Sequence, residues 1–565
     1  MKTRRSLPKP LVAAGIAAVL FLAVAPLRAA TPATGTLSES NPTVTWSGPL
    51  LVPTAGPCGS DNEATCDNFK LTIVPPSAAY GPYLVEVHLA PQGDWDLELY
   101  DPSHGSAGGS GNGPGQLEVA FLVNPAGGIY TIVASPYSPL PGTDGNSYTA
   151  SATLRKDVVV PARQGSEPIS FANYHAPAPL GTSAGEPSIG VSWKTGNVFI
   201  EAITQTLRVA FNDCYVPAVA SWADKSAPTS ATSFDPILFT DSVTGRTVVS
   251  QLITSAAVVS APGDGCSLSS YSDDDGETWI PSEGCGTPGG YDHQSVGGGP
   301  YHAPLTRDPA GPVYPNAVYY CSQEGVTAFC ARSDDGGLTY GPGVPIYTSE
   351  CGGLHGHVKV SPADGTVYVP NKSCFGDNTA NQGVAVSEDN GLTWSIRRVP
   401  FSIPGANDPS VGIAADGTVY FGYQNGDGRA KVAISRDRGL NWTDVGDVGT
   451  PFGIQNIAFP VVTAGDSGRA AFSFLGTPAA GNFQSAGFDG VWHLYSSHTY
   501  DGGLTWTTAD ATPNDPVQRG CIWMQGGSNP CRNLLDFMDS TADKVGRVLV
   551  GYADGCVGTC VQGAS

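Results

Sequence analysis

Carboxylate and imidazole side chains recur in this 565-residue chain directly before short runs of β-forming residues. Such side chains give and take protons in catalysis, and they also ligate metal ions. Proline follows several of these side chains and a β-forming run comes next, so the side chains occupy equivalent positions in a repeated sequence pattern. The residues that share this position are Glu186, Asp235, His302, His357, Asp408 and Asp536.

Pairs of carboxyl groups hydrolyse glycosidic bonds, one group donating a proton while the other acts as base or nucleophile. Glu186, Asp408 and Asp536 are the candidates for such a pair. A polar residue followed by proline also caps turns, and this structural role is an equal alternative for Glu186 and Asp408.

Histidines cluster in one part of the chain, at His293, His302, His355 and His357. The segment His355-Gly356-His357 places two imidazoles on one side of a strand, where they could ligate a metal ion. Hydrogen bonding within loops is the favoured alternative, so the metal, if any, stays unassigned.

A turn motif that repeats five times indicates how these residues are positioned. Its pattern is Ser/Thr-x-Asp-x-Gly-x-Thr-Trp, with single replacements at Asn441 and Tyr340, and its copies are 272–279, 333–340, 387–394, 435–442 and 499–506. The Asp and Ser side chains hydrogen-bond the turn, Gly permits a positive φ, and the aromatic ring fills the space between strands. We interpret these aspartates as structural rather than catalytic.

These repeats resemble the Asp boxes of the sialidase superfamily, and the resemblance covers most of residues 170–565. It implies an all-β fold in which the repeats are blades of a β-propeller. It also implies a glycosidase of the exo-sialidase type.

A second repeat, read as strand, Gly turn and strand, precedes the boxes and counts the blades. Its copies are 186–200, 235–249, 357–369, 408–421, 459–472 and 536–550, with a looser copy at 302–320. Seven blades are therefore favoured, with six as the alternative. The last copy is followed by a short segment, so we expect residues 168–174 to supply a closing strand.

Antiparallel blades place the boxes and the inner hairpin turns on one face of the propeller. The opposite face receives the starts of the inner strands together with the loops after the second strands. These loops contain Gln323, Asn371, Lys372, Tyr423, Asp427, Tyr552 and Asp554. We predict that the functional pocket lies on this second face, where several blades each contribute a side chain.

In sialidases, the resemblance implies, three arginines bind the substrate carboxylate, a Tyr assisted by a Glu is the nucleophile, and an Asp is the acid. The family's Arg-Ile-Pro motif is absent here, and Glu186-Pro187-Ser188 stands near its place. On this hypothesis Arg429, Arg519 and Arg532 bind substrate. Tyr423 or Tyr552 is then the nucleophile, with Glu186 as its base and Asp408 as the acid.

The first 30 residues resemble a secretory signal, with basic residues before an apolar run from Leu11 to Ala25. An uncleaved anchor is the alternative, because the run is at the short limit for spanning a bilayer. Alternating runs over 31–155 predict a β-sandwich accessory domain, and they resemble the bacterial pre-peptidase C-terminal type. Residues 156–175 are expected to be a linker with the closing strand, and residues 176–565 the propeller.

Cofactor requirements are expected to be minimal, with none needed for activity. Asp94, Asp96 and Asp101 could bind a structural calcium ion through carboxylate oxygens. Exposed strand and turn positions are the favoured interpretation for all three.

A net charge of −22 disfavours nucleic acid and anionic membranes as partners. The thirteen cysteines fit an oxidising compartment, so we expect a secreted or cell-surface protein with no membrane insertion after signal cleavage. Close spacing suggests disulfides at 58/66, 321/330, 351/374, 521/531 and 556/560, with Cys214 as the odd thiol.

Three functions stay open on the sequence alone. The first is a sialidase-like glycoside hydrolase acting on glycan termini, so that carbohydrate or a glycoconjugate is the partner. The second is a non-catalytic extracellular propeller that binds glycan or protein. The third is a hydrolase of another polysaccharide that uses a carboxylate pair.

Overall fold

A computed structural model describes residues 30–48, 66–138, 147–157, 159–253, 266–304, 314–324, 327–376 and 379–563. The predicted signal and Cys58 lie outside these ranges. The fold is all-β, as predicted, with three short 3₁₀ helices among the described residues: η1 (Ala78–Tyr80), η2 (Thr450–Phe452) and η3 (Gly558–Cys560). No helix within the described ranges is both long and apolar enough to cross a bilayer.

Two sheets stack to form an N-terminal β-sandwich around a shared core that includes Trp46, Phe69 and Trp95. One sheet has the order β2-β9-β4-β7, with β2 (Thr43–Ser47), β9 (Tyr148–Lys156), β4 (Tyr83–Pro91) and β7 (Glu118–Val123). The other has the order β1-β3-β8-β5-β6, with β1 (Thr34–Leu37), β3 (Asp67–Ile73), β8 (Gly128–Ser138), β5 (Asp94–Tyr100) and β6 (Ser106–Ser110). Alternating burial along β3 and β9 follows the period of two that predicted these strands.

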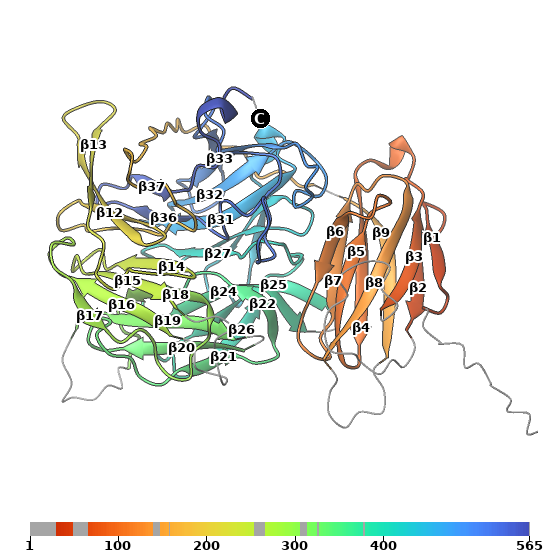
Figure 1. The fold of residues 1–565 in the computed structure, drawn as a ribbon, viewed down its shortest axis with the longest axis horizontal. Coiled ribbons are helices and arrows are strands. Elements are labelled where there is room, and N and C mark those ends of the chain that lie inside the picture. Colours follow the sequence, from red (N-terminus) through yellow and green to blue (C-terminus); the bar gives the residue numbers. More distant parts are fainter. Residues whose placement is uncertain are drawn as a thin grey trace, which may run out of the picture.

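The first three propeller blades are four-stranded antiparallel sheets (Figure 1). Blade 1 contains β10 (Ile189–Val191), β11 (Val198–Ala202), β12 (Gln205–Asn212) and β13 (Val219–Asp224). Blade 2 contains β14 (Pro236–Thr240), β15 (Thr247–Leu252), β16 (Ser267–Ser272) and β17 (Ile280–Ser282). Blade 3 contains β18 (Asp292–Gly299), β19 (Ala317–Glu324), β20 (Thr327–Ser333) and β21 (Val344–Tyr347).

The remaining blades continue the ring. Blade 4 contains β22 (Cys351–His355), β23 (Lys359–Val360), β24 (Val367–Gly376), β25 (Thr379–Ser387) and β26 (Ser395–Arg398). Blade 5 contains β27 (Ser410–Ile413), β28 (Val419–Gln424), β29 (Ala430–Ser435) and β30 (Thr443–Asp447). Blade 6 contains β31 (Asn456–Ala464), β32 (Ala470–Thr477), β33 (Val491–Thr499) and β34 (Thr507–Asp510), with β35 (Gln518–Arg519) beside β33, and a last sheet pairs β36 (Asp539–Ala542) with β37 (Val548–Gly551).

Seven inner strands close a ring in the described part of the chain. Each of β10, β14, β18, β23, β27 and β31 contacts the next, and β36 contacts both β31 and β10. The favoured count of seven is therefore the one observed, although the seventh sheet has only two strands.

The predicted closing strand is wrong. Residues 168–174 are described throughout and adopt no strand. They lie instead against blade 6, where the ring of Phe171 is 5.9 Å from that of His498 and Asn173 donates to the carbonyl of Ala511 at 2.8 Å. The segment before them pairs through Gln164 with Trp506, so it runs along the propeller surface.

The predicted inner hairpin of blade 3 is also wrong, because its first strand is β18 and not a segment that begins at His302. A run of three glycines in β18 concealed the strand, since glycine has low β propensity. Packing explains the glycines: a Cβ at Gly297 would stand 2.4 Å from the Val358 carbonyl oxygen of blade 4, and one at Gly298 would stand 2.6 Å from that of Ala317.

The five Asp boxes lie between the third and fourth strands of blades 2 to 6, and their hydrogen bonds have the predicted structural role. In the first box, Asp274 accepts from the Thr278 amide at 2.8 Å and from the Thr278 hydroxyl at 2.7 Å, while Gly276 donates to Ser272. The bonds from Thr278 lower the pKa of Asp274, so the carboxylate is ionised.

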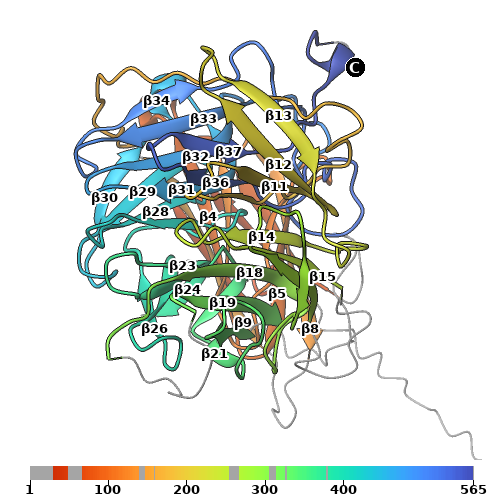
Figure 2. The same ribbon diagram turned by 90° about the vertical axis from the view of Figure 1, so that its left-hand side faces the viewer.

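The sandwich lies against one face of the propeller disc (Figures 1 and 2). Asn482, in the loop after β32, donates to the Ser106 carbonyl at 2.6 Å. A Cβ at Gly426, in the loop after β28, would stand 3.0 Å from the ring of Phe121. Loops that follow second strands belong to the face opposite the boxes, so the sandwich covers part of that face.

Five disulfide bonds link cysteines within the described residues. Four are the predicted pairs 321–330, 351–374, 521–531 and 556–560, and the fifth, Cys266–Cys285, was not predicted. Cys214 is free and exposed, as expected.

Candidate functional site

A pocket opens at the centre of the face opposite the boxes, where the inner strands begin. Its lining comes from all seven sheets of the ring and consists of Glu186, Asp235, His293, Gln294, His355, Gly356, His357, Asp408, Pro409, Ser410, Pro460, Val461, Asp536, Phe537 and Met538. The repeated strand starts therefore bring their side chains together at the predicted place.

Local backbone structure aims these side chains at the channel. Proline follows Glu186, Asp235 and Asp408, and it restricts the preceding residue to extended backbone in most proteins. Glu186 departs from that rule with a φ of 49°, and its N–H donates to the carbonyl of Leu534 at 3.3 Å. A left-handed conformation at a non-glycine residue before proline is strained, and such strain gathers at functional sites.

One side of the pocket holds an ionised carboxylate. Asp408 lies 3.1 Å from Nδ1 of His293 and 3.7 Å from Nζ of Lys372. Burial opposes ionisation of Asp408, but these two cations outweigh it and lower its pKa to about 2. Burial likewise opposes the charge of His293, yet Asp408 raises the pKa of the imidazole above its usual range. The pair is therefore an imidazolium and a carboxylate at neutral pH.

The other side of the pocket holds two carboxyl groups, Glu186 and Asp235, whose pKa values are raised. Burial, followed by repulsion from Asp235 and Asp536, raises the pKa of Glu186 well above its usual value. Burial raises the pKa of Asp235 to about 6. Asp536 is neutralised by Arg532, whose Nη2 donates to it at 2.6 Å. These three groups form a cluster in which Glu186 holds a proton.

Two further imidazoles in the lining are neutral at physiological pH. Burial lowers the pKa of both His355 and His357 to about 4. Nδ1 of His355 hydrogen-bonds the Gly356 carbonyl at 2.9 Å, and the ring of His357 meets that of Phe537 edge-on at 4.5 Å. Neutral imidazoles can accept hydrogen bonds as well as donate them.

Three buried polar atoms of the lining have no hydrogen-bond partner within the described residues. They are Oε2 of Glu186, Oε1 of Gln294 and Nε2 of His355. Buried polar atoms without partners are rare in folded proteins because each costs free energy. At the pocket these three atoms are free to hydrogen-bond a polar ligand.

The sequence-predicted residues divide into two groups. Glu186, Asp408, Asp536 and His357 line the pocket together, and Arg532 stands behind it as the partner of Asp536. The predicted place of His302 is wrong. His302 lies on the box face, where its N–H donates to Asn390 of the third box at 2.7 Å, because the inner strand of blade 3 begins earlier in the chain.

The tyrosines and the other two arginines do not line the pocket. Tyr423 is buried within a hydrophobic cluster, where burial raises its pKa, and the hydroxyl of Tyr552 is 3.4 Å from Asn173. Arg429 donates to the carbonyl of Ile454 at 2.7 Å, and Arg519 donates to that of Cys560 at 2.8 Å.

His293 and Gln294 are pocket residues that the repeat pattern missed. The glycine run that follows these two residues lowers the β propensity of the strand, so the sequence did not predict it. His293 stood out only as a member of the histidine cluster. One further signal in the sequence was Asp292, directly before His293. Asp292 stands at the start of an inner strand, and Asp235 and Asp408 likewise come just before the inner strands of their blades.

The proposed calcium residues of the sandwich occupy different environments. Asp101 accepts from the Ser103 amide at 2.7 Å and from the Gly105 amide at 3.0 Å, so it caps a turn. Asp94 and Asp96 lie on β5, where Asp94 is buried and Asp96 half-buried. Burial and repulsion from Asp94 raise the pKa of Asp96 to about 7.

Comparisons with known proteins found similarity only to solved structures. No family model and no curated protein matches the chain. The Hadza microbial sialidase Hz136 shares 13% identity over 88% of this chain and 94% of its own, with a TM-score of 0.36. The NanB sialidase from Streptococcus pneumoniae shares 10% identity over 70% and 91%, with a TM-score of 0.33, and YCF48 from Cyanidioschyzon merolae shares 12% over 67% and 95%, with a TM-score of 0.35. Likeness at these identities concerns the fold alone.

Proposed function

We propose that this chain is a secreted glycoside hydrolase whose active site is the central pocket, with Glu186 as general acid and Asp408 as the ionised partner. The observation that carries the proposal is the contrast between two carboxyl groups of one pocket. Acidic neighbours and burial keep Glu186 protonated, while His293 and Lys372 keep Asp408 ionised. Carboxyl groups driven apart in this way fit the acid and the base or nucleophile of glycoside hydrolysis.

Sugar hydroxyl groups suit the rest of the lining. A hydroxyl both donates and accepts hydrogen bonds, so it can satisfy the bare atoms of Glu186, Gln294 and His355. Phe537, Pro460 and Val461 supply apolar surface for the carbon-bound hydrogens of a sugar ring.

A sialidase mechanism fits the pocket less well. It needs cations to hold the substrate carboxylate, yet the described lining residues include neither arginine nor tyrosine. The cationic groups nearest the site are already paired, Arg532 with Asp536 and His293 with Asp408. We therefore favour a neutral glycan over a sialylated one.

Release of 4-methylumbelliferone from a panel of glucosyl, galactosyl and sialyl conjugates tests the proposal. Glu186→Gln and Asp408→Asn remove the proton donor and the anion while they keep side-chain size. Asp416→Asn is the matched control, because Asp416 caps the turn at the other end of the same inner hairpin and accepts from Thr418 at 3.0 Å.

The expected result is hydrolysis of a neutral conjugate that Asp408→Asn abolishes, Glu186→Gln lowers and the control keeps. Absence of turnover above the Asp408→Asn background on every conjugate would rule out the enzyme. Hydrolysis confined to the sialyl conjugate would instead support the arginine-based mechanism.

A further inference from the structure

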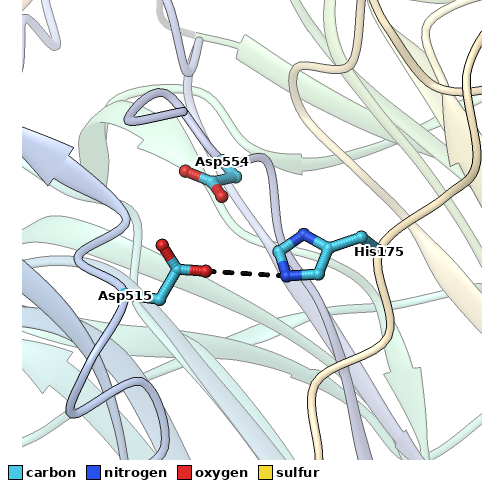
Figure 3. Close-up of side chains that lie close together, drawn as sticks. All are labelled: His175, Asp515 and Asp554. Atoms are coloured by element: carbon cyan, nitrogen blue, oxygen red, sulfur yellow. Dashed lines mark ion pairs between the residues drawn. The ribbon is translucent and has the colours of Figure 1, made fainter. Parts of the chain in front are cut away.

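A second cluster of ligating side chains lies away from the pocket, where the two-stranded seventh sheet leaves the ring unfinished. His175 comes from the segment before blade 1, Asp515 from the loop after β34, and Asp554 from the segment after β37. One ligand atom from each of the three lies within 4.8 Å of the other two. Figure 3 shows the three side chains facing one another from three separate stretches of chain.

The separation of His175 and Asp515, which is short enough for an ion pair, is also that of two ligands of one metal ion. Nε2 of His175 lies 3.5 Å from Oδ2 of Asp515, which is longer than a hydrogen bond between an imidazole and a carboxylate. Two ligands bound at about 2.1 Å in tetrahedral geometry stand about 3.4 Å apart. The observed separation thus matches one edge of a zinc coordination polyhedron.

Charge and orientation give independent support. Asp554 accepts from the Cys556 amide at 2.9 Å, which fixes one carboxylate oxygen and leaves the other as a ligand. The Cys556–Cys560 disulfide follows directly and holds this segment in place. Asp515 and Asp554 are both carboxylates and one oxygen of each lies within 4.8 Å of the other, so the two groups repel each other. A divalent cation between them would relieve that repulsion.

We propose that His175, Asp515 and Asp554 bind one divalent transition-metal ion, Zn²⁺ by preference, which fastens the segment before blade 1 to the end of the propeller. An imidazole nitrogen with two carboxylate oxygens is a donor set that zinc accepts, whereas calcium takes oxygen ligands. The ion replaces the closing strand that residues 168–174 do not form, since it joins the same two parts of the chain. This proposal is independent of the activity proposed for the central pocket.

Zinc titration of the chelator-treated full chain tests the site. Isothermal titration with Zn²⁺ alone is compared for the wild type, His175→Gln and Asp554→Asn. The second variant keeps the oxygen that accepts from Cys556, so its fold should be retained, as circular dichroism would verify. His493→Gln is the matched control, because His493 also stands beside a carboxylate, at 3.7 Å from Asp510.

We expect one Zn²⁺ bound per wild-type and control chain, with at least a tenfold weaker affinity in both site variants. Zinc should also raise the melting temperature of the wild type and the control, but not of the site variants. Ca²⁺ should compete poorly. Equal zinc affinity and an equal rise in melting temperature across all four proteins would overturn the proposal.

Discussion

His293 and Asp408 form a charged pair, 3.1 Å apart, that joins the inner strand of blade 3 to that of blade 5 across the central pocket. Lys372 reaches the second oxygen of Asp408 from blade 4 at 3.7 Å. Three blades therefore determine the charge of one carboxylate. Its role can be separated from that of Glu186 by measurement.

Replacement of Glu186 by Gln should lower kcat/KM by about 10²- to 10⁴-fold on an unactivated glycan, because general acid catalysis contributes that much. The loss should be several-fold smaller on the 4-methylumbelliferyl conjugate, since an aryl leaving group needs little protonation. Steady-state kinetics on both substrates measure the contrast. Equal losses on the two would argue against an acid role.

The Asp536→Asn variant should move the alkaline limb of the activity profile to lower pH. Glu186 donates only while protonated, and Asp536 helps to hold its pKa high. Removal of this anion also frees the charge of Arg532, which lowers the pKa of Glu186 further. The pH dependence of kcat/KM reports the shift, with Asp416→Asn as the control. An unchanged limb would mean that another group governs it.

His357→Ala and His302→Ala should differ in effect although the two residues were equivalent in the sequence pattern. His357 lines the pocket, so its loss should raise KM for the active conjugate several-fold. His302 lies on the box face, and its contact to Asn390 uses the backbone N–H, so its loss should leave kcat and KM within twofold. A large effect at His302 would contradict the observed start of blade 3.

Stability should fall as pH rises from about 4 to 8 because of the sandwich. Burial raises the pKa of Glu118 to about 8, and burial with repulsion from Asp94 raises that of Asp96 to about 7. The folded state then binds more protons than the unfolded state between pH 4 and 8. By linkage, the stabilisation present below pH 4 is lost as pH passes through these raised values.

Urea unfolding at pH 4, 6 and 8 measures that slope. Glu118→Gln cannot ionise, so its stability should change less over this range than that of the wild type. A parallel slope in the variant would place the pH dependence elsewhere.

Truncation of a box aspartate, Asp389→Ala, should cost about 0.5–1.5 kcal/mol of unfolding free energy for each hydrogen bond lost, since water can replace the acceptor at these exposed donors. Asp389 accepts from the Thr393 amide at 2.8 Å and from the Thr393 hydroxyl at 2.6 Å. Activity per folded molecule should not change, because the box lies on the opposite face. Denaturant titration and an active-fraction assay test the two parts separately.

Sequence repeats predicted the blades because each blade repeats the same local physics. The hydrogen bonds of the turns and the Gly turns recur at fixed offsets from the Asp boxes, so the sequence alone predicts where the turns lie. The start of blade 3 was missed because its glycines are required by close packing against Val358 of the neighbouring blade. A local backbone preference does not require them.

Pocket membership was predictable only in part. The residues before inner-strand prolines converge because the ring geometry repeats, and Glu186 and Asp408 lie where expected. The arginines and tyrosines were predicted from the resemblance to sialidases, although this chain lacks the Arg-Ile-Pro motif of that family. Tyr423 packs in a hydrophobic core and Arg429 donates to a backbone carbonyl. These positions depend on tertiary contacts, which the spacing of residues along the sequence does not reveal.

The sandwich covers part of the same face onto which the pocket opens, through contacts such as that of Asn482 with Ser106. Part of the approach to the pocket is therefore blocked. A long polymer lying flat across blades 5 and 6 would collide with the sandwich. The domain pairing thus acts as a steric filter on the direction from which a ligand enters.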